Sequence, residues 1–425
     1  MSVEERFNKV TKAKWTRKDY QLLMFNLLVK FGDSVEIYLP GVITQTVASE
    51  LNLSKIQEGF LGVTMYITMA AAILIVAPIS DRFGRRPVLL TSLYTSILFT
   101  LLCAVVPNYG TLLLSRGLIG LCVGLNMSTA GIFYAEHVSD RSHYTFGTFL
   151  TSFVFAAGGG WVALLGFLLL DLVGWRIFVM CTSIPLFVPP IMILHCCIKA
   201  VDGEVVTEEE ALVSRTSKDV IKVDNLNLRI VKASLFTFIN IFQGYGSILL
   251  LPGLIREENK KRCMSENRVS CNTVVDGNQF LILALVTGVG NLFGRGVGYL
   301  LIKRIRFRIL QPILAVVLSI GYLLLLFKHQ SMVLVVFSMA LCKIVYSMMR
   351  CETSLISFDP MFFGTETIAK ASAIVLGCGM VGSAIGNGCS AFLNPYITVQ
   401  ITFALSIMLI GVVSTISERN SLDFE

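Results

Sequence analysis

The sequence predicts an all-α integral membrane protein in which twelve transmembrane helices form two six-helix bundles. Three observations lead to this fold class. Hydrophobic residues make up 54% of the chain and charged residues only 15%, whereas about a quarter of the residues in a soluble protein are charged. Apolar runs of about 20 residues, each long enough to span a bilayer as a helix, recur along the whole chain. One long polar stretch, Ala200–Asn227, separates six of these runs from six others.

The spans can be placed in order along the chain. The first half is expected to hold helices at 20–48, 56–79, 88–106, 111–135, 145–170 and 176–198. The second half is expected to hold helices at 229–255, 278–302, 309–327, 332–356, 367–393 and 397–416. The predicted units are an N-terminal segment (1–19), a first bundle (20–199), a linker (200–228), a second bundle (229–416) and a tail (417–425). Equal halves joined by one linker indicate a duplicated transporter.

The distribution of Lys and Arg predicts the orientation, because cytoplasmic loops are enriched in both residues. With the N-terminus inside, the cytoplasmic segments carry 22 of the 35 Lys and Arg residues, and the opposite loops carry eight. Both termini are therefore expected in the cytoplasm. The net charge of +7 reflects this topology, since no basic stripe interleaved with aromatic residues indicates a nucleic-acid partner. Residues 1–20 are charged rather than apolar, so no cleavable signal peptide is expected.

The loop between the second and third spans carries the clearest motif. Residues 80–87 read Ser-Asp-Arg-Phe-Gly-Arg-Arg-Pro, and charges at this density belong at a membrane surface. Gly84 allows a tight turn, and Asp81 can pair or cap at a helix end. The form Asp-Arg-x-Gly-Arg-Arg resembles the loop between helices 2 and 3 of major facilitator transporters. The alternative is an ordinary positively charged hairpin.

Charges inside the first predicted helix are the leading functional candidates, because a charge at the bilayer centre is costly unless it is paired or wetted. Lys30, Asp33 and Glu36 lie three residues apart and hence near one face. We expect Asp33 to pair with Lys30 and to approach Glu36. Two close carboxylates away from bulk water suit a proton carrier. The alternative is a static ion pair that only fixes helix packing.

Predicted helix 332–356 carries charges of the second half. Lys343, near mid-depth, shares a face with Tyr346 and Arg350. A cation facing a cavity would attract an anionic substrate or balance the carboxylates of the first helix. Arg350 and Glu352 lie nearer the expected cytoplasmic end and would belong to a gate, or they simply extend to the surface.

Two arginines occupy equivalent positions in the two halves. Arg116 and Arg295 are expected to form structural pairs within their own halves, and Arg116 could also reach a carboxylate of the first helix. Amides and an aromatic residue flanked by glycines are typical of a substrate-binding wall. The uncharged candidates for substrate contact are Asn126, Asn240, Gln243 and Tyr245.

Several sequence segments together resemble a narrower group of transporters within that superfamily. Residues 33–36 read Asp-Ser-Val-Glu, and residues 116–124 follow the pattern Arg-x-x-x-Gly-x-x-x-Gly. Residues 134–136 read Tyr-Ala-Glu and are followed by Arg141. Together they resemble the synaptic-vesicle-two-related and organic ion transporters of the major facilitator superfamily. The resemblance implies alternating-access transport of a small organic ion, with protons or another ion as coupling partner. The gating residues expected on this basis are Asp81, Arg82, Arg85, Arg86, Glu136, Arg141, Arg350 and Glu352.

Departures from the family patterns leave the substrate class open. Ala77 replaces the first glycine of the loop motif, and the second-half copy near 299–308 contains no Asp. The glutamine-rich patterns of sugar porters are missing apart from Gln243, so hexose transport is not expected. The central Lys343 tilts the prediction towards anionic or zwitterionic substrates.

Two other function classes compete with transport. A transport-silent receptor or vesicle component, which binds a ligand or partner without turnover, fits the degenerate second-half gate. An enzyme is not expected, because the sequence holds no catalytic triad, phosphate loop or metal-ligand cluster. The prediction includes no cofactor, no metal and no nucleic acid. It places the protein as a monomer in the plasma membrane or a vesicle membrane, with the lipid bilayer as its environment.

Two covalent modifications are predicted on the non-cytoplasmic side. Cys263 and Cys271 share the polar loop 256–277 and could form a disulfide there, with two free thiols as the alternative. Asn52-Leu53-Ser54 is a glycosylation sequon, although its loop is short and close to the membrane.

Overall fold

The computed structural model describes residues 15–139, 141–196, 226–265, 282, 285–302, 305, 307–326, 332–356 and 368–417, and the regular elements among them are all helical. The first half contains α2 (Arg17–Glu50), α3 (Lys55–Phe83), α4 (Arg85–Val105), α5 (Tyr109–His137) and α6 (Arg141–Cys196). The second half contains α8 (Leu226–Ser265), the π-helical turn η1 (Leu285–Val289), α10 (Gly290–Ile302), α11 (Phe307–Leu325), α12 (Met332–Ile356), α14 (Ile368–Phe392) and α15 (Pro395–Ser417).

These helices account for the twelve predicted spans. The long helix α6 contains the fifth and sixth spans, which meet at a non-helical Gly174, and η1 continues into α10 as the eighth span. Seven helices among the described residues are long and apolar enough to cross a membrane, and one of them, Phe146–Cys196 within α6, is 51 residues long. A length of 51 residues suffices for two crossings. The predicted fold class is therefore confirmed.

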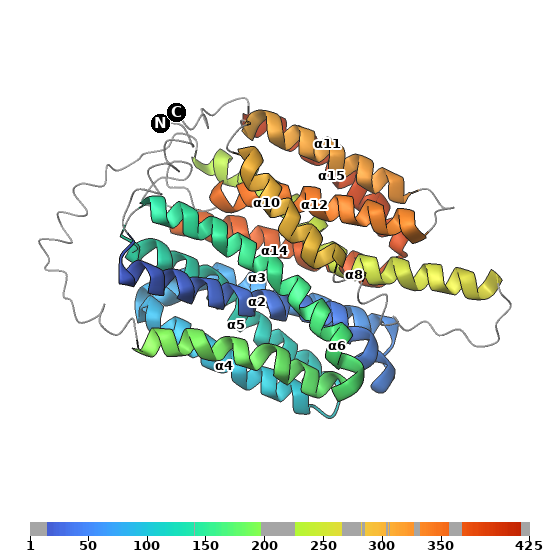
Figure 1. Ribbon diagram of the computed structural model, residues 1–425, viewed down its shortest axis with the longest axis horizontal. Helices are drawn as coiled ribbons and strands as arrows, with labels where there is room; N and C mark the ends of the chain where they lie inside the picture. The colour runs from blue at the N-terminus through green and yellow to red at the C-terminus, as the bar shows by residue number, and fades with distance from the viewer. Residues whose placement is uncertain are drawn as a thin grey trace, which may run out of the picture.

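The two halves form two groups of helices that lie side by side. In Figure 1, α2 to α6 lie in the lower part, in blue to green, and α8 to α15 lie above them, in yellow to red. The halves touch where α3 packs on α14, where α6 packs on η1 and α10, and where α2 meets α8. We call the first two of these contacts the seams.

Local sequence signals explain where the helices of the first half begin and end. Capping boxes open α2 at Thr16 and α3 at Ser54, and the Asn108 side chain caps α5. A cap of this kind satisfies backbone N–H groups that have no partner within the helix. Gly84 and Gly174 adopt φ values of 85° and 73°, a region that glycine enters without strain. The predicted turn at Gly84 is thus confirmed.

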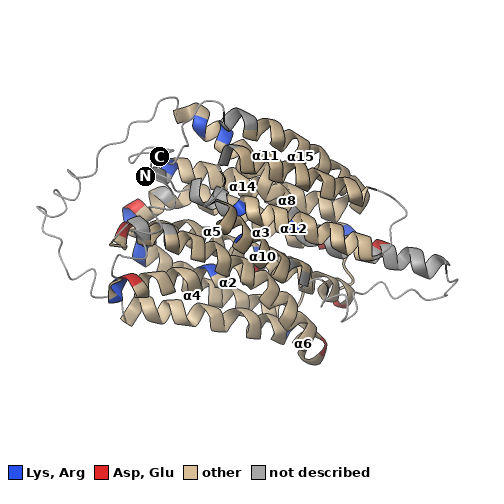
Figure 2. Cartoon of the chain, turned by 45° about the horizontal axis from the view of Figure 1, so that its top comes forward, with Lys and Arg blue, Asp and Glu red and all other residues tan. Residues whose placement is uncertain are grey.

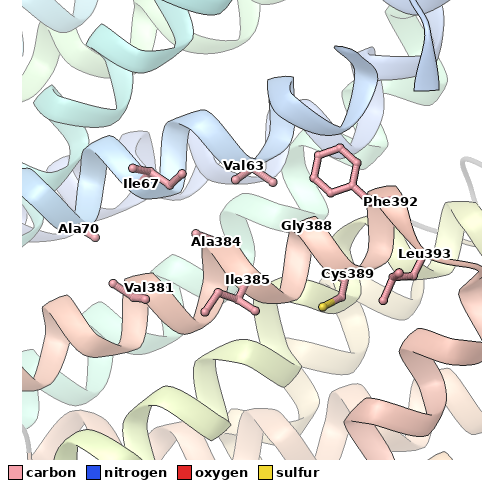
Figure 3. A pocket seen from close by; sticks show the side chains of 10 residues that line it. All are labelled: Val63, Ile67, Ala70, Val381, Ala384, Ile385, Gly388, Cys389, Phe392 and Leu393. Atoms are coloured by element: carbon pink, nitrogen blue, oxygen red, sulfur yellow. The ribbon is translucent and has the colours of Figure 1, made fainter. Parts of the chain in front are cut away.

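Both seams are closely packed. A Cβ atom built on Gly160 of α6 would lie 2.7 Å from the Cα of Gly288 in η1, so the two backbones touch. At the same seam the rings of Phe149 and Tyr299 stack with centroids 3.9 Å apart. At the other seam an apolar groove of about 610 Å³ runs between α3 and α14 (Figure 3). Its lining includes Ile67, which is 54% exposed, so the groove opens outward onto the apolar surface of the bundle.

Charged side chains gather mainly at the helix ends, as Figure 2 shows by its blue and red segments. One end of the bundle carries Arg17, Arg82, Arg85 and Arg86, and we call it the basic end; the opposite end carries Glu50 and Arg176. A smaller set of charged side chains is buried between the ends. Among the described residues this set comprises Lys30, Asp33, Glu36, Arg116, Arg295, Lys343 and Arg350.

Candidate functional site

A buried ion pair links α2 to α5 in the first half. Arg116 Nη1 lies 3.2 Å from Glu36 Oε2, and the two side chains are 3% and 0% exposed. Thr100 Oγ1 of α4 donates a hydrogen bond to the other Glu36 oxygen at 3.1 Å. Arg116 therefore reaches the first helix, as its position in the sequence allowed, and the charge of Glu36 is balanced inside the half.

The second buried carboxylate of α2 is held by an amide. Asn126 Nδ2 donates to Asp33 Oδ1 at 3.3 Å, and Ser92 Oγ of α4 donates to Asn126 Oδ1 at 2.5 Å. The other oxygen of Asp33, Oδ2, is buried and accepts no hydrogen bond from the described residues. This half-satisfied carboxylate is a candidate functional group, because a buried polar atom without a partner is costly.

Lys30 and Asp33 interact electrostatically, but the hydrogen bond of Lys30 goes to another helix. The Lys30 ammonium donates to the backbone carbonyl oxygen of Met127 in α5. The side chain of lysine is long and flexible, so it reaches the neighbouring helix and does not fold back along its own. Lys30 still lies close enough to Asp33 to act on it electrostatically.

The buried charges of the second half have one sign. Within its described residues, the buried charged side chains are Arg295, Lys343 and Arg350, all of them cations. The Lys343 ammonium donates to the carbonyl oxygen of Gly244 at 2.9 Å and lies 6.0 Å from the centre of the Tyr346 ring. The first half, in contrast, buries carboxylates together with its cations.

Four tyrosines from α2, α3, α8 and α12 meet between the halves. These four residues, which we call the tyrosine cluster, are all buried; they are Tyr38, Tyr66, Tyr245 and Tyr346. The Tyr245 ring centroid lies 6.3 Å from that of Tyr38 and 6.1 Å from that of Tyr66, distances typical of aromatic pairs. Tyr346 packs on α8 directly, since a Cβ at Gly244 would overlap its ring. Arg295 and Arg350 act electrostatically on Tyr38 and Tyr245.

The amides predicted on the seventh span are both buried in α8. Gln243 Nε2 donates to the carbonyl oxygen of Thr402 at 3.2 Å, whereas Gln243 Oε1 has no hydrogen-bond partner among the described residues. Neither polar atom of the Asn240 side chain has one. Asn240 lies four residues before Gly244, and hence on the same face of α8 as the carbonyl that binds Lys343.

The loop motif forms a network at the basic end. Arg85 lies 2.6 Å from Glu136 and 3.5 Å from Asp81, measured between nitrogen and oxygen atoms. Arg86 Nη2 donates to the carbonyl oxygen of Leu194 at 3.1 Å and so ties α4 to the end of α6. The Arg82 guanidinium lies over the ring of Phe83 at 5.4 Å. The motif thus joins α3, α4, α5 and α6 within the first half.

The predicted gating residues also include Arg350, Arg141 and Glu352. Arg350 is buried and close to the tyrosine cluster. Arg350 acts electrostatically on Tyr38 of α2 as well as on Tyr245 of α8, and its gating role stays a prediction. The side chains of Arg141 and Glu352 lie outside the described part of the chain, as do those of Cys263 and Cys271. Asn52 stands in the turn between α2 and α3 with φ of 51° and an exposed side chain.

Sequence reasoning missed an anchor at the basic end. Asp19 accepts hydrogen bonds from the backbone N–H and the hydroxyl of Ser139 and from Thr16. Burial alone would raise the pKa of Asp19, but these hydrogen bonds together outweigh it and lower the pKa from 3.8 to about 2. His143 Nδ1 lies 3.7 Å from the same carboxylate. The capping pattern Thr16-x-x-Asp19 was the only sign of this group in the sequence.

A second missed anchor lies at the opposite end. Glu50, at the end of α2, accepts a hydrogen bond from Trp175 Nε1 at 2.5 Å and forms an ion pair with Arg176. The hydrogen bond from Arg176 lowers the pKa of the Glu50 carboxyl. The sixth span is predicted to begin at 176, but nothing in the sequence connects the preceding Trp175 with a residue 125 positions earlier.

Two helical halves with buried charges and a shared aromatic cluster define a membrane protein of the transporter class. The sequence profile of the Major Facilitator Superfamily matches residues 26–387, and the chain belongs to this superfamily.

Relatives and solved structures agree with this assignment. The chain is 26% identical to synaptic vesicle glycoprotein 2A of Rattus norvegicus over 35% of this chain and 20% of that protein. It is 27% identical to a gentisate transporter of Corynebacterium glutamicum over 52% of this chain and 51% of that protein. Each match thus covers about half or less of the relative's length. A D-xylose-proton symporter structure shares the fold, with a TM-score of 0.70, 15% identity and coverage of 93% and 97% of the two chains.

Proposed function

We propose that the protein is a secondary active transporter that moves a small organic anion or zwitterion across a membrane by alternating access. The observation that carries this proposal is the positive sign of the buried charges among the described residues of the second half. Arg295, Lys343 and Arg350 place positive charge beside the tyrosine cluster. Burying cations at a membrane interior is costly, and an anionic substrate between the halves would offset that cost.

The tyrosine cluster supports a substrate that carries a flat ring. Aromatic rings of Tyr38, Tyr66 and Tyr245 come from both halves and meet at one point. Such a cluster can stack on a ring while nearby cations bind a carboxylate. Gentisate, the ligand named for one relative, is itself an aromatic carboxylate. Aromatic carboxylates are therefore the first substrates to test, with Asn240 as an additional hydrogen-bonding group.

Asp33 is proposed to carry the coupling proton. Its Oδ2 atom is buried without a hydrogen-bond donor among the described residues, so binding a proton there relieves the cost of a buried negative charge. The Asn126 amide would hold the carboxyl group in place in both protonation states. Glu36 has a different role, because its charge is already balanced by Arg116.

The network at the basic end is proposed to act as a gate, and the basic end to face the cytoplasm. Arg85 with Asp81 and Glu136 would separate or shift when the transporter opens to that side. The positive-inside rule supports this orientation and would place both termini in the cytoplasm, with 200–228 as the linker between the bundles. We propose that the protein functions as a monomer. Its partial similarity to a synaptic vesicle protein makes a vesicle membrane the first location to examine, ahead of the plasma membrane.

Uptake into proteoliposomes tests the proposal directly. A mixed pool of organic anions, zwitterions and cations is offered under an imposed pH gradient, and mass spectrometry identifies what accumulates. We expect aromatic carboxylates to accumulate and the accumulation to vanish when the gradient is collapsed. Accumulation of cations only would contradict the substrate proposal. Ligand binding without any accumulation, from folded protein, would indicate a receptor that binds without turnover.

The variant Asp33→Asn separates coupling from transport. We expect gradient-driven accumulation to be lost while exchange of labelled for unlabelled substrate continues, because the amide cannot carry a proton. Asp171→Asn is the matched control, since Asp171 is an exposed carboxylate in the α6 region between the fifth and sixth spans. Unchanged accumulation and pH dependence in Asp33→Asn would exclude Asp33 as the proton carrier.

A further inference from the structure

A second groove lies at the basic end, away from the interface between the halves. It has a volume of about 560 Å³ and lies between the start of α2 and the end of α6. Its lining consists of Trp15, Arg17, Tyr20, Gln21, Met24 and Ile193. Tyr20 and Met24 are 55% and 49% exposed, so the groove is open on the outer surface of the first half.

The side chains that line the groove are cationic and aromatic at its outer end and apolar at its inner end. Arg17 is exposed and forms no ion pair with any described residue. Trp15 and Tyr20 are amphipathic aromatic residues of the type that gathers at the membrane surface. Met24 lies about two helical turns beyond Arg17, towards the middle of the bundle, and faces Ile193 across the groove. The groove thus has the cationic Arg17 at its outer end and the apolar side chains of Met24 and Ile193 along its inner part, which we call the apolar floor.

This combination restricts the chemistry of the occupant. A small inorganic anion would use Arg17 but would gain nothing from Met24 and Ile193. A purely apolar molecule would use the floor and leave the guanidinium without a partner. A phospholipid uses both, because its phosphate can bind the guanidinium while an acyl chain covers the apolar side chains. Because Arg17 is cationic and exposed, it favours an anionic headgroup.

We propose that this groove is a binding site for an anionic phospholipid of the leaflet at the basic end. The phosphate binds Arg17, with Gln21 as a second donor, and one acyl chain runs along Met24 and Ile193. The site does not depend on the identity of the transported substrate.

The walls of the groove are held in place by the anchor around Asp19. The Trp15 ring stacks on His143 with centroids 4.1 Å apart and lies 5.3 Å from the ring of Tyr20. Asp19 fixes the start of α2 to Ser139 in the turn between α5 and α6. Because these contacts already order the aromatic wall, a lipid would bind without having to organise it. Lipid binding would also stabilise the junction between α2 and α6.

Native mass spectrometry of the full chain tests the headgroup contact. The protein in detergent is offered phosphatidylglycerol and phosphatidylcholine with identical acyl chains. We expect preferential retention of phosphatidylglycerol and a loss of about tenfold in its affinity for Arg17→Gln, the effect of losing one charge-assisted contact. Lys18→Gln is the matched control, since Lys18 is exposed on the same helical turn but does not line the groove. Equal losses in both variants would overturn the site, because they would indicate attraction to surface charge alone.

A second pair of variants tests the apolar floor. Ile193→Trp fills the groove and is expected to reduce retention of phosphatidylglycerol about tenfold, whereas Met192→Trp, at an exposed neighbour outside the lining, leaves it unchanged. Displacement of the lipid by inorganic phosphate would overturn the proposal in favour of a soluble anion. Equal retention of the two lipids by the wild-type chain would overturn it as well.

Discussion

In the first half, buried carboxylates lie next to buried cations, whereas in the second half the buried charged side chains of the described residues are all cations. Glu36 is paired with Arg116, and Asp33 lies near Lys30 and binds Asn126. Lys343, by comparison, donates to a backbone carbonyl oxygen at 2.9 Å and forms no ion pair with a described residue. Among the described residues, the buried charges are thus balanced in the first bundle and positive in the second.

Under the proposed function, this difference means that the first half binds the coupling proton and the second half binds the anionic substrate. The first half is close to neutral and contains a carboxylate, Asp33, whose charge one proton can remove. The described residues of the second half place buried cations near the tyrosine cluster, which both halves share. A proton bound at Asp33 would add one positive charge to the first half, and a bound monovalent anion would offset one positive charge of the second half. Binding both therefore leaves the total charge unchanged, which favours their movement together across a low-dielectric interior.

The largest expected effect on stability comes from removing the counter-charge of Glu36 in the first half. Arg116→Leu leaves Glu36 buried without its partner, and we expect the free energy of unfolding to fall by about 3–5 kcal/mol. Thermal unfolding of the detergent-solubilised protein measures the change. The double variant Glu36→Leu/Arg116→Leu should recover most of the loss, because it removes the isolated charge. A single variant as stable as the wild type would show that the pair is not what balances this half.

A smaller effect is expected from removing one cation of the second half. Lys343→Gln retains a donor for the Gly244 carbonyl but loses the charge, and we expect kcat/KM for anion uptake to fall by about 10- to 100-fold, equivalent to about 1.4–3 kcal/mol. Uptake rates in proteoliposomes measure it. Lys55→Gln, at an exposed position at the start of α3, is the control. If both variants transport anions at the wild-type rate, the positive charge of the second half does not serve substrate binding.

The smallest expected effect concerns the anchor of the first half at the basic end. Asp19→Asn weakens the cap of α2 and the contact with Ser139, and we expect a loss of about 1 kcal/mol in stability.

The pH dependence of that loss follows from the lowered pKa of Asp19, about 2 instead of 3.8. The ionised carboxylate contributes its full stabilisation above its ordinary pKa and loses it as the pH falls through the folded value. The difference between wild type and Asp19→Asn should therefore be constant from about pH 5 to pH 8 and shrink below about pH 4. Thermal unfolding at several pH values measures it, with Ser139→Ala as a milder comparison. A difference that grows on acidification would contradict this account of the anchor.

Much of the fold could be predicted from sequence because a bilayer imposes strong one-dimensional constraints. Each span must be apolar over about 20 residues, and loops must be polar, so the twelve spans and the turn at Gly84 follow from local composition. The superfamily also followed, because its loop motif is contiguous in the chain. Hydrogen bonds between helices were harder to predict: Lys30 interacts electrostatically with Asp33 of its own helix but donates to the carbonyl oxygen of Met127 in α5.

The sequence by itself determined the number of spans and indicated which charged residues lie within them, although it did not indicate that Asp19 is buried. Only the tertiary structure decided which of those residues meet. Glu36 and Arg116 are 80 positions apart, and the tyrosine cluster takes one residue from each of four helices. The physical reason is that hydropathy sets the length and depth of a helix, whereas its rotation and its neighbours depend on packing against all the others.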